Sequence, residues 1–140
     1  GTGVQHSEKN KNQDQPVKFF QIWIFPNLKN VEPRYDQQHF DDTEKHNRLL
    51  TVVSPLGSND PGVQIHQEAW FSLGKLDKGF STIYNLHQPG HGVYAFVIEG
   101  NISINGQALS RRDGLAITET DSFTIKADSE AELLLMEVPV

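Results

Sequence analysis

Two pairs of side chains have the residue types and the spacing of a metal site. His6 and Glu8 lie two positions apart, and His66 and Glu68 repeat this spacing. Residues i and i+2 of a strand point to the same face, so each pair could present an imidazole and a carboxylate to iron or another divalent ion. An oxygen-activating mononuclear site needs about three or four protein ligands, and each pair supplies only two. The alternatives are that His6 and Glu8 are exposed polar residues near a chain end and that His66 is a hydrogen-bonded histidine of a sheet.

A third pair, His87 and His91, flanks the tripeptide Gln88-Pro89-Gly90. Two imidazoles on either side of a turn can converge on one ion. Pro-Gly is also typical of an exposed turn, in which both histidines are solvated. The sequence leaves both interpretations open.

The elements that must position these residues are short strands. Residues 17–25 are rich in β-branched and aromatic side chains and are stopped by Pro26, which predicts a strand buried on both faces. Residues 28–48 are polar, and a Glu-Pro step at 32–33 disfavours a continuous helix, so we expect an extended arm or linker there. The rest of the chain alternates apolar runs with turn residues, as in an antiparallel barrel or sandwich. The runs are 49–54, 63–73, 80–86, 93–99, 102–105, 114–118, 122–127 and 131–138.

Aromatic residues are concentrated in two of these elements. Phe19, Phe20, Trp23 and Phe25 lie in the first predicted strand, where we expect core packing, although a pocket lined by these rings is the alternative. Trp70 and Phe71 are adjacent, so one should face inward and the other outward or toward the linker. The outward one is a candidate interface residue.

Length and composition limit the classes of protein. The chain has 140 residues, which is one domain or one domain plus a fragment. It has no cysteine, so disulfides, thiolate zinc sites and cysteine nucleophiles are excluded. The formal net charge of −6 disfavours direct binding to nucleic-acid phosphates. No apolar run approaches the roughly 18 residues of a membrane span, and the first residues are polar, so we expect a cytoplasmic protein without membrane contact.

Several stretches resemble known families. Residues 94–106, YAFVIEGNISING, resemble the first conserved motif of the cupin barrel, with Glu99 and Gly106 at the separation that cupins use. GTGVQHSE at 1–8, QIWI at 21–24 and PRY at 33–35 resemble the pirin family in the same order. With DGLAI at 113–117 and the closing apolar strand, the resemblance covers nearly the whole chain.

The resemblance to pirins implies a fold and a division of the chain. Pirins consist of two consecutive cupin barrels, the first with a metal and the second usually without one. This chain has about half the length of such a two-barrel protein. We therefore expect residues 1–27 to be a remnant of the first, metal-binding barrel, 28–48 a linker arm and 49–140 a C-terminal metal-free cupin barrel. The fold class is then all-β, a cupin-like antiparallel β-barrel or jelly roll with an extra N-terminal strand and arm.

The resemblance also carries a metal half-site. The family's later His-x-Glu pair maps onto His6 and Glu8, whereas its earlier His-x-His pair has no counterpart here. In the second barrel a cupin site would place two histidines four to six positions before the motif glutamate. Those positions hold Val93 and Ala95, or Gly92 and Tyr94, and residues 113–127 contain no histidine. The intact family implies Fe or another divalent metal, and we expect none in this chain alone.

Two functions of different class follow from the family. Some bacterial pirins are quercetin 2,3-dioxygenases, and eukaryotic members are iron-dependent transcriptional coregulators. The first hypothesis is a non-catalytic module that serves ligand binding, dimerisation or partner recognition. The alternative is a metal-dependent quercetin 2,3-dioxygenase with a flavonoid-like substrate, whose metal site is only partly present. A homodimer, possibly by strand exchange, is expected because the strand over 17–25 lacks neighbours and would expose a large apolar patch.

Overall fold

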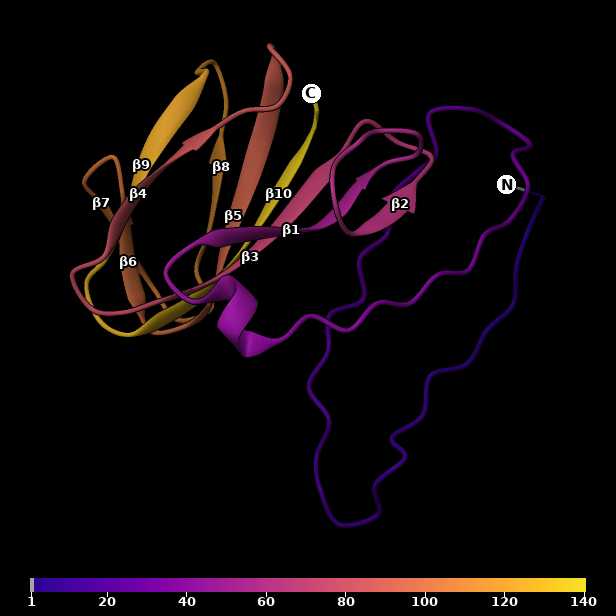
Figure 1. Cartoon of the computed structure of the whole chain (residues 1–140), viewed down its shortest axis with the longest axis horizontal. Coiled ribbons are helices and arrows are strands. Elements are labelled where there is room, and N and C mark those ends of the chain that lie inside the picture. Colours follow the sequence, from indigo (N-terminus) through magenta and orange to yellow (C-terminus); the bar gives the residue numbers. More distant parts are fainter. Residues whose placement is uncertain (1) are drawn as a thin grey trace.

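The computed structural model describes residues 2–140, and strands make up nearly all of its regular structure (Figure 1). The elements in chain order are the 3-10 helix η1 (Asp42–Lys45) and the strands β1 (Leu49–Pro55), β2 (Val63–Ile65), β3 (Trp70–Leu76), β4 (Ser81–Asn85), β5 (His91–Glu99), β6 (Asn101–Ile104), β7 (Gln107–Ser110), β8 (Gly114–Ile117), β9 (Ser122–Ala127) and β10 (Ala131–Pro139). No helix within residues 2–140 is long and apolar enough to cross a membrane.

The strands form two sheets that face each other. One sheet has six strands in the order β2-β1-β3-β10-β5-β8, and the other has four in the order β4-β9-β6-β7. Neighbouring strands are antiparallel except β1 and β2, which pair in parallel. This arrangement is a jelly roll, and the expectation of an all-β, cupin-like antiparallel fold is confirmed.

The period of two along each strand separates the inner from the outer side of the six-stranded sheet. On β10, Leu133 belongs to the core between the sheets, whereas the next residue, Leu134, belongs to a second cluster on the outer side. The inner core takes side chains from both sheets, for example Val97 on β5 and Ile125 on β9, both fully buried. The space between the sheets is therefore filled with apolar side chains over most of its length.

Two tight turns fix the cupin-like segment. Asn105 and Gly106 form the hairpin turn that joins β6 to β7, with φ of 48° and 85° at the two turn residues. Glu99 ends β5, and Gly100 follows with φ of 81°. A Cβ at position 100 would collide with the carbonyl oxygen of Glu130, so this turn requires glycine.

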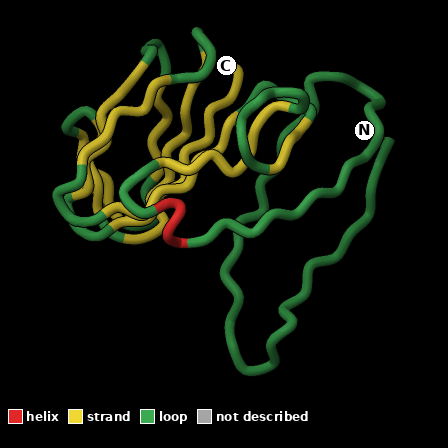
Figure 2. Tube along the Cα trace, viewed as in Figure 1, coloured by secondary structure: helices red, strands yellow, loops and turns green. Residues whose placement is uncertain are grey.

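The strand expected over residues 17–25 is not formed. The described chain before η1 is loop throughout, as Figure 2 shows. A strand needs a neighbouring strand edge to receive its N–H and C=O groups, and this segment crosses the outer face of the six-stranded sheet instead of lying along its edge. Ile24 packs on the outer cluster that contains Phe71, and the Phe20 ring meets Phe96 edge to face at 5.4 Å.

Two hydrogen bonds hold the end of this segment to the turn after β2. Gln67 Nε2 donates to the carbonyl of Phe25 at 2.9 Å, and the Asn27 amide donates to the carbonyl of His66 at 2.8 Å. The core packing expected for the aromatic rings is wrong for Phe19, Trp23 and Phe25, which are 64%, 83% and 84% exposed. Phe71, the outward neighbour of Trp70, is covered by the chain's own N-terminal segment.

Candidate functional site

The first predicted pair, His6 and Glu8, lies in the exposed N-terminal loop. His6 Nε2 is 4.0 Å from Glu8 Oε1, and both side chains are more than half exposed. Within residues 2–140 no cluster of three or more His, Cys, Asp or Glu side chains has the geometry to hold a metal ion. Two exposed groups do not supply the ligands of a catalytic metal, so the residues present do not fit the metal that the family implies.

The second predicted pair, His66 and Glu68, does not lie on a strand. The apolar run over 63–73 is divided into β2 and β3 by a bend, and both residues lie in that bend. The expectation that they share a strand face is therefore wrong. Glu68 is exposed, and the carbonyl of His66 accepts the hydrogen bond from the N-terminal segment described above.

The third pair does converge, but on a carboxylate. His87 Nδ1 is 2.8 Å from Glu137 Oε2, and His91 Nδ1 is 3.3 Å from Glu137 Oε1. His91 is 8% exposed and lies at the start of β5, so the interpretation as a solvated turn residue is wrong for His91, whereas His87 is exposed in the bend before β5. The Nδ1 of His91 is close to the carboxylate without the alignment of a hydrogen bond and is a buried polar atom without a partner in the described chain.

Glu137 is fully buried near the end of β10 and points between the sheets, in phase with Leu133 and Leu135. The Tyr84 hydroxyl donates to Oε2 at 2.8 Å. The backbone amides of His87 and Gln88 donate to Oε1 at 2.9 and 3.0 Å. These donors, together with His87 Nδ1, satisfy a carboxylate that would otherwise be costly to bury.

The same contacts determine the protonation of the group. Burial raises the pKa of the Glu137 carboxyl, but the hydrogen bonds from His87, Tyr84 and the Gln88 amide outweigh burial and hold the pKa below its ordinary value. The pKa of the Tyr84 hydroxyl is raised by burial and by the Glu137 charge. At neutral pH the site therefore contains a carboxylate and a protonated tyrosine.

Trp70 fixes the imidazole of His87 from one side. The two rings are stacked with centroids 4.7 Å apart and planes 6° apart. The indole Nε1 of Trp70 donates to Asp60 Oδ2 at 2.8 Å, which holds the indole in place. The imidazole is thus held by a stacked ring on its face and by a carboxylate at Nδ1.

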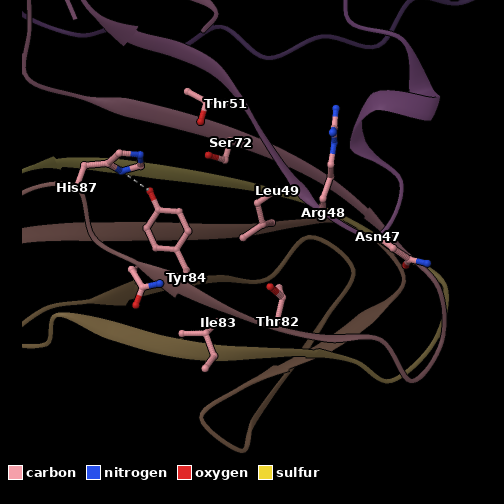
Figure 3. Close-up of a pocket in the computed structure, with 10 residues that line it drawn as sticks. Asn47, Arg48, Leu49, Thr51, Ser72, Thr82, Ile83, Tyr84 and His87 are labelled. Carbon is pink, nitrogen blue, oxygen red and sulfur yellow. Dashed lines mark hydrogen bonds between the residues drawn. The ribbon is translucent and has the colours of Figure 1, made fainter. Parts of the chain in front are cut away.

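This cluster forms one wall of a pocket between the sheets, which we call the inter-sheet pocket. It is a cavity of about 320 Å³, and its polar lining residues include Thr51, Ser72, Thr82, Tyr84, Asn85 and His87. Figure 3 shows Thr51 and Ser72 on one side of it, with the Tyr84 hydroxyl and the His87 ring beside them. Arg48 also lines the pocket and is exposed, with its Nε bonded to the Glu44 carbonyl.

The sequence reasoning missed Glu137, Tyr84 and Ser72. One signal was available: Glu137 continues the alternating inward positions of β10, where it follows Ala131, Leu133 and Leu135. A charged residue in phase with the apolar side of a strand has to be paired.

Comparison with known proteins finds one matching family and several similar proteins. Residues 51–138 match the family of the quercetinase C-terminal cupin domain. The quercetin 2,3-dioxygenase of Escherichia coli K12 is 34% identical over 139 residues, which are 99% of this chain and 58% of the relative. The chain thus spans little more than half the length of that relative.

Solved structures agree with this similarity. The crystal structure of YhhW from Escherichia coli superposes with a TM-score of 0.76 at 33% identity and covers 84% of this chain and 49% of YhhW. The structure of bacterial pirin YhhW in complex with nickel(II) gives a TM-score of 0.74 at 32% identity, with 84% and 48% covered.

Proposed function

Since the chain belongs to the pirin family through its quercetinase-type C-terminal cupin domain, we propose that it is a small-molecule binding module that is not catalytic by itself. The observation that carries the proposal is the inter-sheet pocket, which is backed by the buried and fully bonded Glu137. Concave sites with a few fixed polar groups are the usual places where proteins bind small ligands.

The composition of the jelly-roll interior supports a role without metal. Val93 and Ala95 on β5 stand where a cupin site would have histidines, and they are 2% and 0% exposed in the apolar core. Neither side chain has a donor atom for a metal. His87 and His91, which precede these positions in the chain, both turn their Nδ1 atoms toward Glu137.

Elemental analysis and a turnover assay test this proposal. We expect well below one equivalent of Fe, Ni, Cu or Zn in the dialysed protein and no quercetin consumption. His6→Ala should change neither result. A full metal equivalent that is lost in His6→Ala, or Fe-dependent quercetin turnover that survives dialysis, would overturn the proposal.

The alternative is a metal-dependent oxidoreductase of the quercetin 2,3-dioxygenase type that acts on a flavonoid-like substrate. It is favoured by the name of the Escherichia coli relative and by the nickel(II) in the related pirin. In this alternative His6 and Glu8 are half of a site for Fe or another divalent metal, and further ligands come from residues outside this chain. Adding those residues would then create stoichiometric metal binding.

We further propose that the chain forms a homodimer in the cytoplasm and binds neither nucleic acid nor membranes. The support for dimerisation is the apolar strip of Phe19, Trp23 and Phe25, three aromatic residues that the chain's own sheets leave exposed. The acidic net charge of −6 supports the lack of nucleic-acid binding.

A further inference from the structure

The bonds to Glu137 determine which hydrogen-bonding groups face the inter-sheet pocket. An ionised carboxylate only accepts hydrogen bonds, so the Tyr84 hydroxyl and His87 Nδ1 both direct their hydrogens toward it. In a neutral imidazole the proton on Nδ1 leaves Nε2 as an acceptor. Tyr84 and His87 therefore offer lone pairs, not protons, to a molecule in the pocket.

Three other lining residues, Thr51, Ser72 and Thr82, carry hydroxyls. The side-chain hydroxyls of Thr51 and Thr82 make no hydrogen bond to other residues within 2–140, and the same holds for His87 Nε2. Ser72 is 2% exposed, and its hydroxyl is directed at the Tyr84 oxygen (Figure 3), so it offers the pocket its lone pairs. These groups need partners that both donate and accept, and an alcohol hydroxyl does both.

The charges near the pocket and its volume further restrict the class of ligand. A carboxylate or phosphate at the His87 end of the pocket would place its lone pairs against those of Tyr84 and His87 and close to the buried Glu137 charge, whereas the exposed Arg48 lies at the other end, with its Nε bonded to the Glu44 carbonyl (Figure 3). An ammonium ion cannot accept from the hydroxyls and would meet the Arg48 guanidinium. A cavity of about 320 Å³ is at the small end of ligand sites and suits a single ring.

From these groups we infer that the inter-sheet pocket binds a neutral polyhydroxylated molecule of one ring, a monosaccharide or cyclic polyol. Its hydroxyls donate to His87 Nε2 and to Ser72 and accept from Thr51. The apolar side chain of Leu49 in the lining provides surface for the ring carbons. This inference rests on the proposed binding function and adds the ligand class to it.

Three sugars of one shape and different charge test the inference: D-glucose, D-glucuronate and D-glucosamine. Each is titrated into the ¹⁵N-labelled chain, and the amide signals of His87 and Gln88 are followed, because both amides bond Glu137 at the pocket wall. We expect a saturable shift with glucose, with a Kd on the order of millimolar for so small a ligand. Binding of glucuronate and glucosamine should be at least about fivefold weaker.

Variants that each remove one hydroxyl test the contacts, and one of them is a control outside the pocket. Ser72→Ala and Thr51→Val should each weaken glucose binding about three- to tenfold, as expected for one lost hydrogen bond. Ser110→Ala, the same change on exposed β7, should leave it unchanged. The amide spectrum itself reports whether each variant is folded.

The outcomes separate the ligand class from the binding function. Saturable shifts with glucuronate or glucosamine but not with glucose would overturn the ligand class and leave the pocket as a binding site. The absence of any shift with all three sugars, and with quercetin, would overturn both. Equal binding by wild type, Ser72→Ala and Thr51→Val would show that the sugar lies elsewhere and would also overturn the inference.

Discussion

Replacing Glu137 by glutamine removes one charge from the site at nearly constant volume. Glutamine keeps one acceptor oxygen. Its amide nitrogen replaces the carboxylate oxygen that, in the wild type, accepts from Tyr84 and His87. Tyr84 can rotate its hydroxyl and His87 can change its tautomer, so we expect the fold to survive. The main loss is the charge on the acceptor of four hydrogen bonds, from Tyr84 Oη, His87 Nδ1 and the backbone amides of His87 and Gln88.

The magnitude follows from the difference between charged and neutral bonds. A hydrogen bond to a charged group contributes about 1.5 to 3 kcal/mol and a neutral one about 0.5 to 1.5 kcal/mol. Four such changes, reduced because the neutral side chain is cheaper to bury, amount to about 3 kcal/mol of unfolding free energy. For a chain of this size, that corresponds to a melting temperature lower by about 6 to 12 °C.

Urea denaturation followed by circular dichroism measures this loss as a shift of the midpoint at constant slope. Glu132→Gln on the same strand is the control, because Glu132 is partly exposed and its nearest cation, Lys75 Nζ, is 3.9 Å away. That change should cost well below 1 kcal/mol. If Glu137→Gln costs no more than Glu132→Gln, the bonds to the buried carboxylate do not stabilise the fold, and the reasoning is refuted.

The remaining predictions concern pH, a turn and assembly. The folded-state pKa of the Glu137 carboxyl lies below its ordinary value of 4.5. The carboxylate therefore contributes its full stabilisation above pH 4.5, and this stabilisation is lost as the pH falls through the folded-state pKa. We expect the difference in unfolding free energy between wild type and Glu137→Gln to disappear in acid, as measured by urea denaturation at several pH values. Gly100→Ala should lower the free energy of unfolding by about 2 kcal/mol or more, measured by urea denaturation. Gly106→Ala is the control, because Gly106 also has a positive φ but a Cβ there would meet no atom within 4 Å. This change should lower the free energy of unfolding by only about 1 kcal/mol. Sedimentation at micromolar concentration should show a dimer that Trp23→Ser weakens, and a wild-type chain that stays a soluble monomer would contradict the dimer.

The jelly roll was predictable because its local signals agree with one another. Period-two alternation marks strands such as β9 and β10, and Asn105-Gly106 specifies its hairpin without help from distant residues. The failure at residues 17–25 has the opposite origin. Composition favours a strand there, but strand formation depends on a free neighbouring edge, which a single segment does not reveal.

The candidate site was only partly predictable, for a related reason. The spacing of His87 and His91 around a turn correctly indicated convergence, but the group between them is Glu137, about fifty positions further along the chain. Only the pairing of β10 with β5 brings them together. The pairs at His6 and His66 had equally suggestive spacing, yet neither lies on a strand, so spacing alone did not place their side chains on one face.

The central claim is that this chain binds a small ligand between its sheets without a metal. The most direct test is a glucose titration of the His87 and Gln88 amide signals in protein treated with a chelator, repeated after adding one equivalent of Ni²⁺ or Fe²⁺ (the latter without oxygen). We predict the same saturable shift and the same Kd in the presence and absence of metal. Binding that disappears with the chelator and returns only with the metal would contradict the account.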